Sequence, residues 1–195
     1  SLIPKGVLGY DDSLPALEYD PERAKELLAE AGYPDGITFT CTMTEGSDWD
    51  KIYQVLQEQY KLANITMEIE KVDSAGWLDK RSTGNVQFYM MNWYADFVDP
   101  DNFLYSLFHS SVATFFSNGM NDPEWDAKLD AGRLITDLDE KQEYYAELEY
   151  WLSREQVAEW PLYAPAGYTL VSDRVKEVFC KSDFLMSFTE GYIEE

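Results

Sequence analysis

Residues 86–108, VQFYMMNWYADFVDPDNFLYSLF, carry the pattern from which the fold can be worked out. The first part, residues 86–93, is almost continuously apolar and aromatic. A run this short and this apolar predicts a β-strand that is buried on both faces. Asp99-Pro100 then predicts the start of a helix, with Asp as the N-cap residue and Pro at the first helical position. The apolar face of that helix is supplied by Phe103, Leu104, Leu107 and Phe108.

Asp96 belongs neither to the predicted strand nor to the predicted helix cap. In open α/β sheets, ligands bind just beyond the carboxyl ends of strands, and Asp96 follows the predicted strand at that position. A carboxylate there can hold a ligand ammonium by short, charge-assisted hydrogen bonds where water is excluded. The neighbouring rings of Trp93 and Tyr94 can shield the pair and add cation–π attraction. The alternative, which residue types alone favour, is that Asp96 only caps or turns the chain locally.

Alternating strand and helix patterns precede this stretch. Residues 37–43 alternate apolar side chains with Thr, and residues 65–70 alternate apolar with polar side chains, so both predict strands with one wetter face. Apolar residues at helical spacing follow the first strand from Trp49 to Tyr60, and a short helix from Ser74 follows the second. The order strand, helix, strand, helix, strand predicts two crossover units and a largely parallel sheet flanked by helices, which is an α/β fold.

Residues 1–19 are punctuated by Pro and Gly, which predicts a loop across the surface. Asp20-Pro21 predicts the start of a helix that ends near Gly32. The second half is predicted to be mostly helical. Residues 160–163 and 168–171 are predicted as short strands joined by a turn at residues 165–167, and residues 179–195 have no clear period.

The length of 195 residues predicts one domain, or one lobe of a larger protein. The formal net charge of -22 argues against nucleic acid as a partner, because phosphate binding requires clustered Lys and Arg. Such acidity ordinarily serves solubility, and more weakly favours cationic ligands. Cys41 and Cys180 are too few for a disulfide framework, and both free thiols and one bridge remain possible. No run has the length of a membrane span, and no signal peptide opens the chain.

Signatures of enzymes and of metal sites are missing. His109 is the single histidine and has no metal-ligand partner at the required spacing, which argues against zinc. Asp96, Asp99 and Asp101 could form a carboxylate pair for acid–base work or a calcium site, but the spacing lacks the glycine and glutamate of a calcium loop. We therefore expect no catalytic residues, no metal and no cofactor. The alternative is a freestanding metal-dependent hydrolase built on this Asp cluster.

Three segments resemble one known family. Residues 19–33, YDPERAKELLAEAGY, are similar to the YDPEKAKELLAEAGY segment of the peptide-binding proteins of ABC importers, which bind dipeptides, oligopeptides or nickel outside the cytoplasm. Residues 93–104, WYADFVDPDNFL, resemble the W-x-A-D-Y-x-D-P-x-x-F-L stretch of these proteins (bacterial solute-binding protein family 5). Residues 161–168 and 172–176 resemble a late PLYxPxGY and SDRVKG segment. The matches run in family order through most of the chain.

The resemblance implies a type II periplasmic-binding-protein-like fold, with residues 1–195 forming the C-terminal lobe of a two-lobed protein whose N-terminal lobe is missing here. It implies that Asp96 binds the α-ammonium of a peptide and that Trp93 and Tyr94 line the pocket. Asn92 stands where the family usually has Gly, which reshapes the pocket wall. Residues after 178 depart from the family's return to the first lobe.

The implied partners are a peptide or other small solute, the permease subunits of an ABC transporter and the missing lobe. The implied location is extracytoplasmic, either in the periplasm or on the cell surface as a lipid-anchored protein. Some relatives with a similar motif bind non-peptide solutes, so a nickel complex, a sugar or another solute remains an alternative to a peptide.

Overall fold

The computed structural model describes the whole chain except residues 48, 117, 166–167, 181–185 and 195. It contains two compact units. The strand unit comprises Pro15–Met91 and Ala113–Gly119, and the helical unit comprises Ser1–Leu14, Asn92–Val112 and Met120–Glu195. Across the described residues, no helix combines the length and the apolar character needed to cross a membrane.

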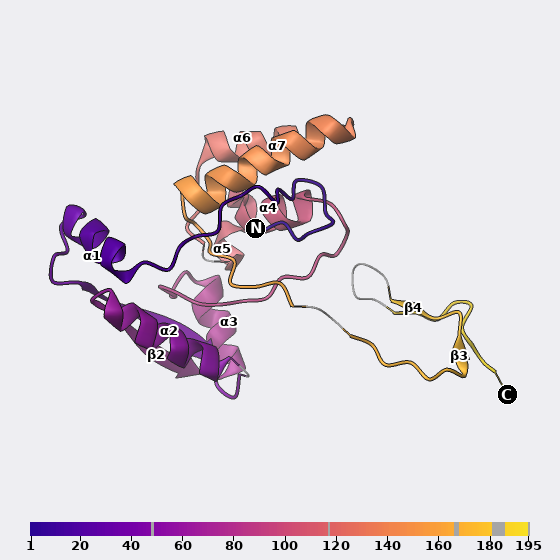
Figure 1. Cartoon of the computed structure of the whole chain (residues 1–195), viewed down its shortest axis with the longest axis horizontal. Helices are drawn as coiled ribbons and strands as arrows, with labels where there is room; N and C mark the ends of the chain where they lie inside the picture. Colours follow the sequence, from indigo (N-terminus) through magenta and orange to yellow (C-terminus); the bar gives the residue numbers. More distant parts are fainter. Residues whose placement is uncertain (48, 117, 166–167, 181–185, 195) are drawn as a thin grey trace. The chain divides into compact units, whose positions relative to one another are not determined.

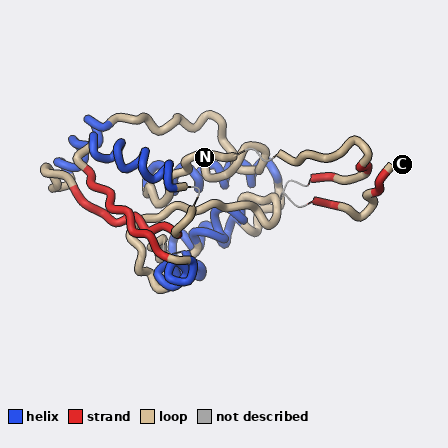
Figure 2. Tube along the Cα trace, turned by 90° about the horizontal axis from the view of Figure 1, so that it is seen from below, coloured by secondary structure: helices blue, strands red, loops and turns tan. Residues whose placement is uncertain are grey.

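The strand unit is built on two parallel strands, drawn in red in Figure 2. Strand β1 (Ile37–Thr44) pairs along its whole length with β2 (Ile65–Val72). Helix α2 (Asp50–Leu62) connects them and α3 (Ser74–Ser82) follows β2 (Figure 1). This strand–helix–strand crossover confirms the predicted parallel pairing, and the fold class is α/β as predicted from the alternation.

The core of the strand unit lies between α2 and the strand pair. Alternate residues of each strand face the helix, because successive side chains point to opposite sides of a sheet. The buried members of this cluster are Cys41, Met43, Tyr53, Leu56 and Met67.

The predicted buried strand at residues 86–93 is wrong in its detail. Phe88 forms a single parallel bridge to Cys41, and its carbonyl accepts a hydrogen bond from the Thr42 backbone N–H at 2.9 Å. The segment therefore runs alongside β1, but it forms no continuous ladder and none of residues 86–93 is fully buried. Ring contacts hold it instead: Phe88 lies 5.2 Å from Phe39, and Tyr89 lies 5.1 Å from Trp77. A run of apolar residues predicts burial but does not specify the neighbours that complete a sheet.

Helix α1 (Pro21–Glu30) begins as predicted. The Asp20 carboxylate accepts a hydrogen bond from the Arg23 backbone N–H at 2.9 Å, and Pro21 occupies the first turn, where its missing N–H costs nothing. Gly32 adopts a φ of +92° just past the end, which confirms it as the C-terminal stop.

The helical unit contains α4 (Asp101–Phe108), α6 (Pro123–Gly132) and α7 (Leu138–Tyr150). A short π-helix (Trp151–Glu155) continues α7, and α5 (Ser110–Phe116) runs from this unit into the strand unit. The prediction that the second half is mostly helical is thus confirmed as far as Glu155. The core is formed by residues that recur at helical spacing, among them Leu104, Phe108, Trp125, Leu129, Tyr145 and Leu152.

Helix α4 begins one residue later than predicted. Pro100 occupies the N-cap position, and the Asp99 carboxylate accepts a hydrogen bond from the Asp101 backbone N–H at 3.0 Å. Asp99 therefore still satisfies one of the unpaired N–H groups at the helix start, which is the purpose of a capping carboxylate.

Residues 1–19 contain no helix or strand, as predicted, but the segment does not merely lie across the surface. Ile3 is completely buried, the Leu2 backbone N–H donates to Glu149 at 2.6 Å, and the Gly9 backbone N–H donates to Gln142 at 2.8 Å. These contacts fix the segment to α7, because buried apolar area and paired backbone groups both oppose its release.

The predicted strands at residues 160–163 and 168–171 are wrong, since both segments are irregular and Tyr168 and Leu170 are almost fully exposed. Part of the turn predicted at residues 165–167 lies outside the described residues. The chain then forms two short antiparallel pairs: β3 (Val175–Lys176) with β6 (Tyr192–Ile193), and β4 (Phe179–Cys180) with β5 (Met186–Ser187).

Candidate functional site

The four predicted ligand-binding residues lie together in the segment of the helical unit that leads into α4. Asn92 and Asp96 are exposed, Trp93 is half-buried, and the Tyr94 side chain is 50% exposed. None of the four belongs to a helix or strand. Loops presented by a rigid element are common positions for binding residues, and α4 is the element here.

Asp96 differs from the two other carboxylates of the motif. Asp99 pairs with Lys141 at 2.5 Å and Asp101 pairs with Arg133 at 3.5 Å. Among the described residues, no lysine or arginine lies within ion-pair distance of Asp96. Its one hydrogen bond in this part of the chain uses its backbone N–H, so its carboxylate oxygens remain available to a ligand.

The three carboxylates also differ in how far they are buried. Burial raises the pKa of Asp101, although the positive charge of Arg133 lowers it. Arg133 also lies over the ring of Tyr105, 4.2 Å from its centroid, which holds the guanidinium beside α4. Asp99 and Asp101 therefore belong to the internal charge balance of the helical unit, whereas the exposed Asp96 does not.

Apolar side chains surround the exposed carboxylate in sequence. Phe97 and Val98 are each 49% exposed, close to the value for Tyr94. Large apolar side chains that gather on a surface beside a few polar groups are typical of binding sites, because a ligand or partner covers them in the bound state.

Asn102 is a residue that the sequence-based interpretation missed. It is the second residue of α4 and is only 1% exposed. Its Oδ1 atom accepts hydrogen bonds from the Trp93 indole Nε1–H and from the Asp96 backbone N–H, both at 3.1 Å. The available signal was an amide side chain directly before the apolar residues Phe103 and Leu104, because a polar residue buried in such a face requires a partner.

Side chains that could bind a metal ion do not cluster in the described part of the chain. No three His, Cys, Asp or Glu side chains there are arranged to hold a metal ion. His109 ends α4, where its Nδ1 atom lies 2.8 Å from the Ser111 hydroxyl and its Nε2 atom lies 3.8 Å from Asp126. These contacts give His109 a local structural role at the helix end.

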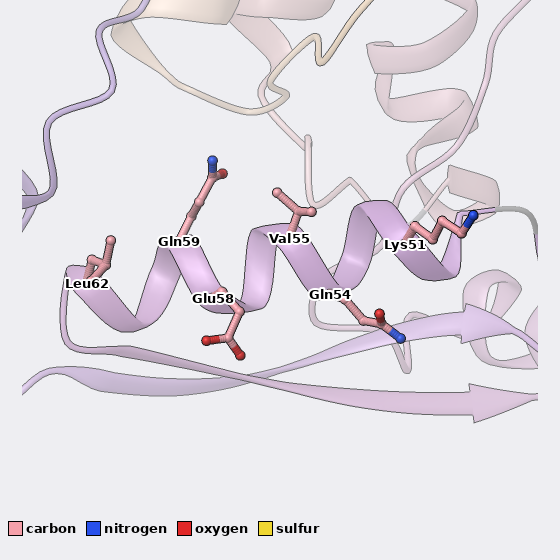
Figure 3. Close-up of a pocket in the computed structure, with 6 residues that line it drawn as sticks. All are labelled: Lys51, Gln54, Val55, Glu58, Gln59 and Leu62. Atoms are coloured by element: carbon pink, nitrogen blue, oxygen red, sulfur yellow. The ribbon is translucent and has the colours of Figure 1, made fainter.

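A shallow hollow lies on the strand unit, on the face of α2 shown in Figure 3. Val55 and Gln59 project from the helix, away from the two strands drawn beneath it. All of its lining residues come from this one helix and all are exposed: Lys51, Gln54, Val55, Glu58, Gln59 and Leu62. A hollow bounded by a single helix encloses little of a ligand, and it contains none of the predicted site residues.

Comparison with known proteins gives a family match. The profile of "Bacterial extracellular solute-binding proteins, family 5 Middle" matches residues 1–115, which include the whole segment from Asn92 to Asp96. This range is more than half of the chain.

Two curated relatives and one solved structure illustrate the match. Heme-binding protein A of Haemophilus influenzae is 26% identical over 89% of this chain, and Di/tripeptide-binding protein 2 of Pseudomonas aeruginosa is 28% identical over 83%. The ABC transporter-associated periplasmic binding protein DppA of Helicobacter pylori, solved with the peptide STSA, is 27% identical over 76% of this chain with a TM-score of 0.70. The fold is therefore of the type II periplasmic-binding-protein kind.

The chain spans about a third of the length of these proteins: 33% and 31% of the two relatives, and 30% of the solved chain. All three are named as binding proteins.

Proposed function

Because the chain belongs to the bacterial extracellular solute-binding proteins of family 5, we propose that it is one lobe of a two-lobed receptor for peptides. In this proposal residues 1–195 form a single lobe, and Asp96 binds the peptide α-ammonium in a cleft that a second lobe closes. Trp93 and Tyr94 flank the ammonium, and Asn92 forms part of the pocket wall. The protein has no chemistry of its own.

The observation that carries the proposal is the state of Asp96. It is the exposed carboxylate of a motif in which Asp99 and Asp101 are both paired with cations. A ligand ammonium would supply the missing positive charge. The half-exposed Trp93 and Tyr94 would exclude water from the pair and make the charge-assisted hydrogen bonds stronger than in water.

The names of two similar proteins support a peptide ligand. One relative is named as a di/tripeptide-binding protein, and the solved structure contains a peptide. The relative named as a heme-binding protein supports a second candidate, a non-peptide solute bound by the same lobe. A nickel complex or a sugar falls in the same class of alternative.

The partners follow from the same proposal. The receptor would deliver its solute to the permease subunits of an ABC transporter. It would work outside the cytoplasm, either free in the periplasm or anchored by lipid to the cell surface. The isolated lobe would bind peptide weakly or not at all, because half of the cavity would be absent.

Titration calorimetry on the full-length protein, with the dipeptide Ala-Phe as probe, tests the proposal. Asp96→Asn removes the negative charge with little change in shape. We expect it to weaken binding by about 1.5–3 kcal/mol, which is the range for a hydrogen bond to a charged group. N-acetyl-Ala-Phe, which lacks the ammonium, should bind the unaltered protein as weakly as Ala-Phe binds the variant.

Asp35→Asn is the matched control, because Asp35 is an exposed carboxylate outside the motif. It should leave the affinity unchanged. Equal affinity of Asp96→Asn and unaltered protein for Ala-Phe would show that Asp96 is not the amine anchor.

A further inference from the structure

The side chain of Asn102 connects the two ends of the candidate site. One buried oxygen, Oδ1, accepts from Trp93 Nε1–H and from Asp96 N–H, at 3.1 Å each. The two donors flank Tyr94 and Ala95, so this single atom fixes both ends of the segment that presents the indole and the carboxylate.

The orientation of the amide follows from its partners. An indole N–H and a backbone N–H can only donate, so the atom that meets both must be the oxygen and not the amide nitrogen. An amide oxygen has two lone pairs, and these two donors use both of them. A side chain of the same size without an acceptor would remove both of these hydrogen bonds.

Asn102 is itself held firmly in place. Its backbone N–H donates to the Asp99 carbonyl at 3.1 Å. The residues on either side of this turn are tied to other helices, Asp99 to Lys141 of α7 and Asp101 to Arg133 at the end of α6. The amide oxygen is thus supported by three helices of the helical unit.

We propose that Asn102 is a positioning residue of the ligand site. It fixes the segment from Trp93 to Asp96 so that the ring and the carboxylate face a ligand together. This inference rests on the proposed function of Asp96. Pre-organisation of this kind strengthens binding because the ligand does not have to order the loop.

The main variant is Asn102→Leu, which has a similar volume and no acceptor. In the full-length protein, we expect it to weaken Ala-Phe binding about tenfold, the effect of losing one to two net hydrogen bonds. Asn102→Asp keeps an acceptor oxygen at the same position and should recover most of the affinity. Leu104→Val loosens packing in the same helix without touching either donor, and it should change the affinity less than twofold.

A second measurement reports the contact without any ligand. In a proton–nitrogen correlation spectrum, the Trp93 indole N–H signal, assigned with Trp93→Phe, should shift and exchange faster with solvent in Asn102→Leu. The indole signals of the other tryptophans should stay in place. An unmoved Trp93 signal in folded Asn102→Leu would overturn the inference.

A double-mutant cycle separates positioning from general loosening. If Asn102 acts through Asp96, Asn102→Leu should cost much less affinity in the Asp96→Asn background than alone. Equal losses in both backgrounds would overturn the positioning role. If Asp96→Asn alone leaves Ala-Phe binding unchanged, the proposed function fails; if it weakens binding while Asn102→Leu does not, only the role of Asn102 fails.

Discussion

The Nζ atom of Lys141 lies 2.5 Å from Oδ2 of Asp99, which joins α7 to the residue that caps α4. The two side chains are 14% and 28% exposed, so the pair is partly removed from water. Lys141 also lies 5.7 Å from the ring centroid of Tyr145. The position of the candidate site therefore depends on a charge 42 residues further along the chain.

Lys141→Met should destabilise the start of α4. The variant leaves the Asp99 carboxylate without its cation in a partly desolvated position, and we expect a loss of about 1–2 kcal/mol, between the values for exposed and buried pairs. Amide hydrogen exchange of α4 measures this locally. Lys71→Met is the control, because the pair of Lys71 with Asp50 is more exposed and should contribute less than about 1 kcal/mol. Equal protection of α4 in unaltered protein and Lys141→Met would contradict the expectation.

Leu129→Ala should cost about 2–5 kcal/mol of unfolding free energy, since Leu129 is completely buried in α6 and the truncation leaves a cavity. Leu134→Ala makes the same chemical change just after the helix, at a side chain that is 81% exposed, and should cost less than about 0.5 kcal/mol. Denaturant unfolding measures the loss of unfolding free energy in each variant. Hydrogen exchange of the α6 amides then shows whether the loss arises in α6. Similar losses at both positions would mean that Leu129 is not buried in the core beneath α6.

The elements that could be predicted from the sequence are those with local signals. Helix α1 follows from Asp20, Pro21 and Gly32, whose backbone preferences act within a few residues. Strands β1 and β2 follow from strict alternation, and the connecting helix fixes their parallel direction.

The wrong predictions concern segments whose structure depends on residues that are distant in the sequence. Residues 86–93 have the composition of a core strand, but the structure gives them only the bridge at Phe88 and a set of ring contacts. Residues 160–163 have the apolar composition of a strand, but composition cannot supply the neighbouring strand that a ladder requires.

The candidate site shows the same division. Asp96, Trp93 and Tyr94 could be chosen as candidates from their residue types and their place at the end of an apolar run, but only the resemblance to the family favoured ligand binding over a local turn at Asp96. The pairing of Asp99 with Lys141 could not, because nothing local to Asp99 indicates a lysine in α7. The double hydrogen bond of Asn102 likewise depends on the path of the loop, which no periodic pattern specifies.

Cys41 should react with thiol reagents only when the strand unit opens. Burial raises the pKa of the Cys41 thiol to about 12, so almost no thiolate is present at pH 8. In a Cys180→Ser background, we expect labelling by an aromatic disulfide reagent to be at least about 100-fold slower than that of a free thiol near pKa 8.5, and to become fast in denaturant. Rapid labelling at pH 8 without denaturant would show that Cys41 is accessible.

The same shift makes the strand unit sensitive to alkali. Because the folded-state pKa lies above the unfolded value, the unfolded state loses its proton first as pH rises. The stability tied to the neutral thiol is fully present below about pH 8.5 and is lost progressively from there toward pH 12. Cys41→Ala removes this dependence, so the difference in stability between the two proteins should shrink over that range. A constant difference would contradict the shift.

Gly36→Ala should damage the start of the strand pair far more than Gly32→Ala. Both glycines have nearly the same positive φ, +89° and +92°, so both substitutions carry the same left-handed strain of about 1–2 kcal/mol. A Cβ at Gly36 would also lie 1.9 Å from the Asn64 carbonyl oxygen, whereas a Cβ at Gly32 would have no atom within 4 Å. That oxygen accepts the Ile37 backbone N–H at 3.3 Å, so relieving the clash must break the entry into β1.

We therefore expect Gly36→Ala to cost about 3 kcal/mol or more, at the upper end for single substitutions, and Gly32→Ala to cost only its strain. Exchange rates of the β1 amides distinguish the two, because they report on local opening at the strand whose start the Gly36 clash would disrupt. Equal protection of β1 in both variants would mean that the backbone at Asn64 can move aside freely. The parallel register of Ile37 with Ile65, from which the rest of the pairing follows, would then not depend on this close approach.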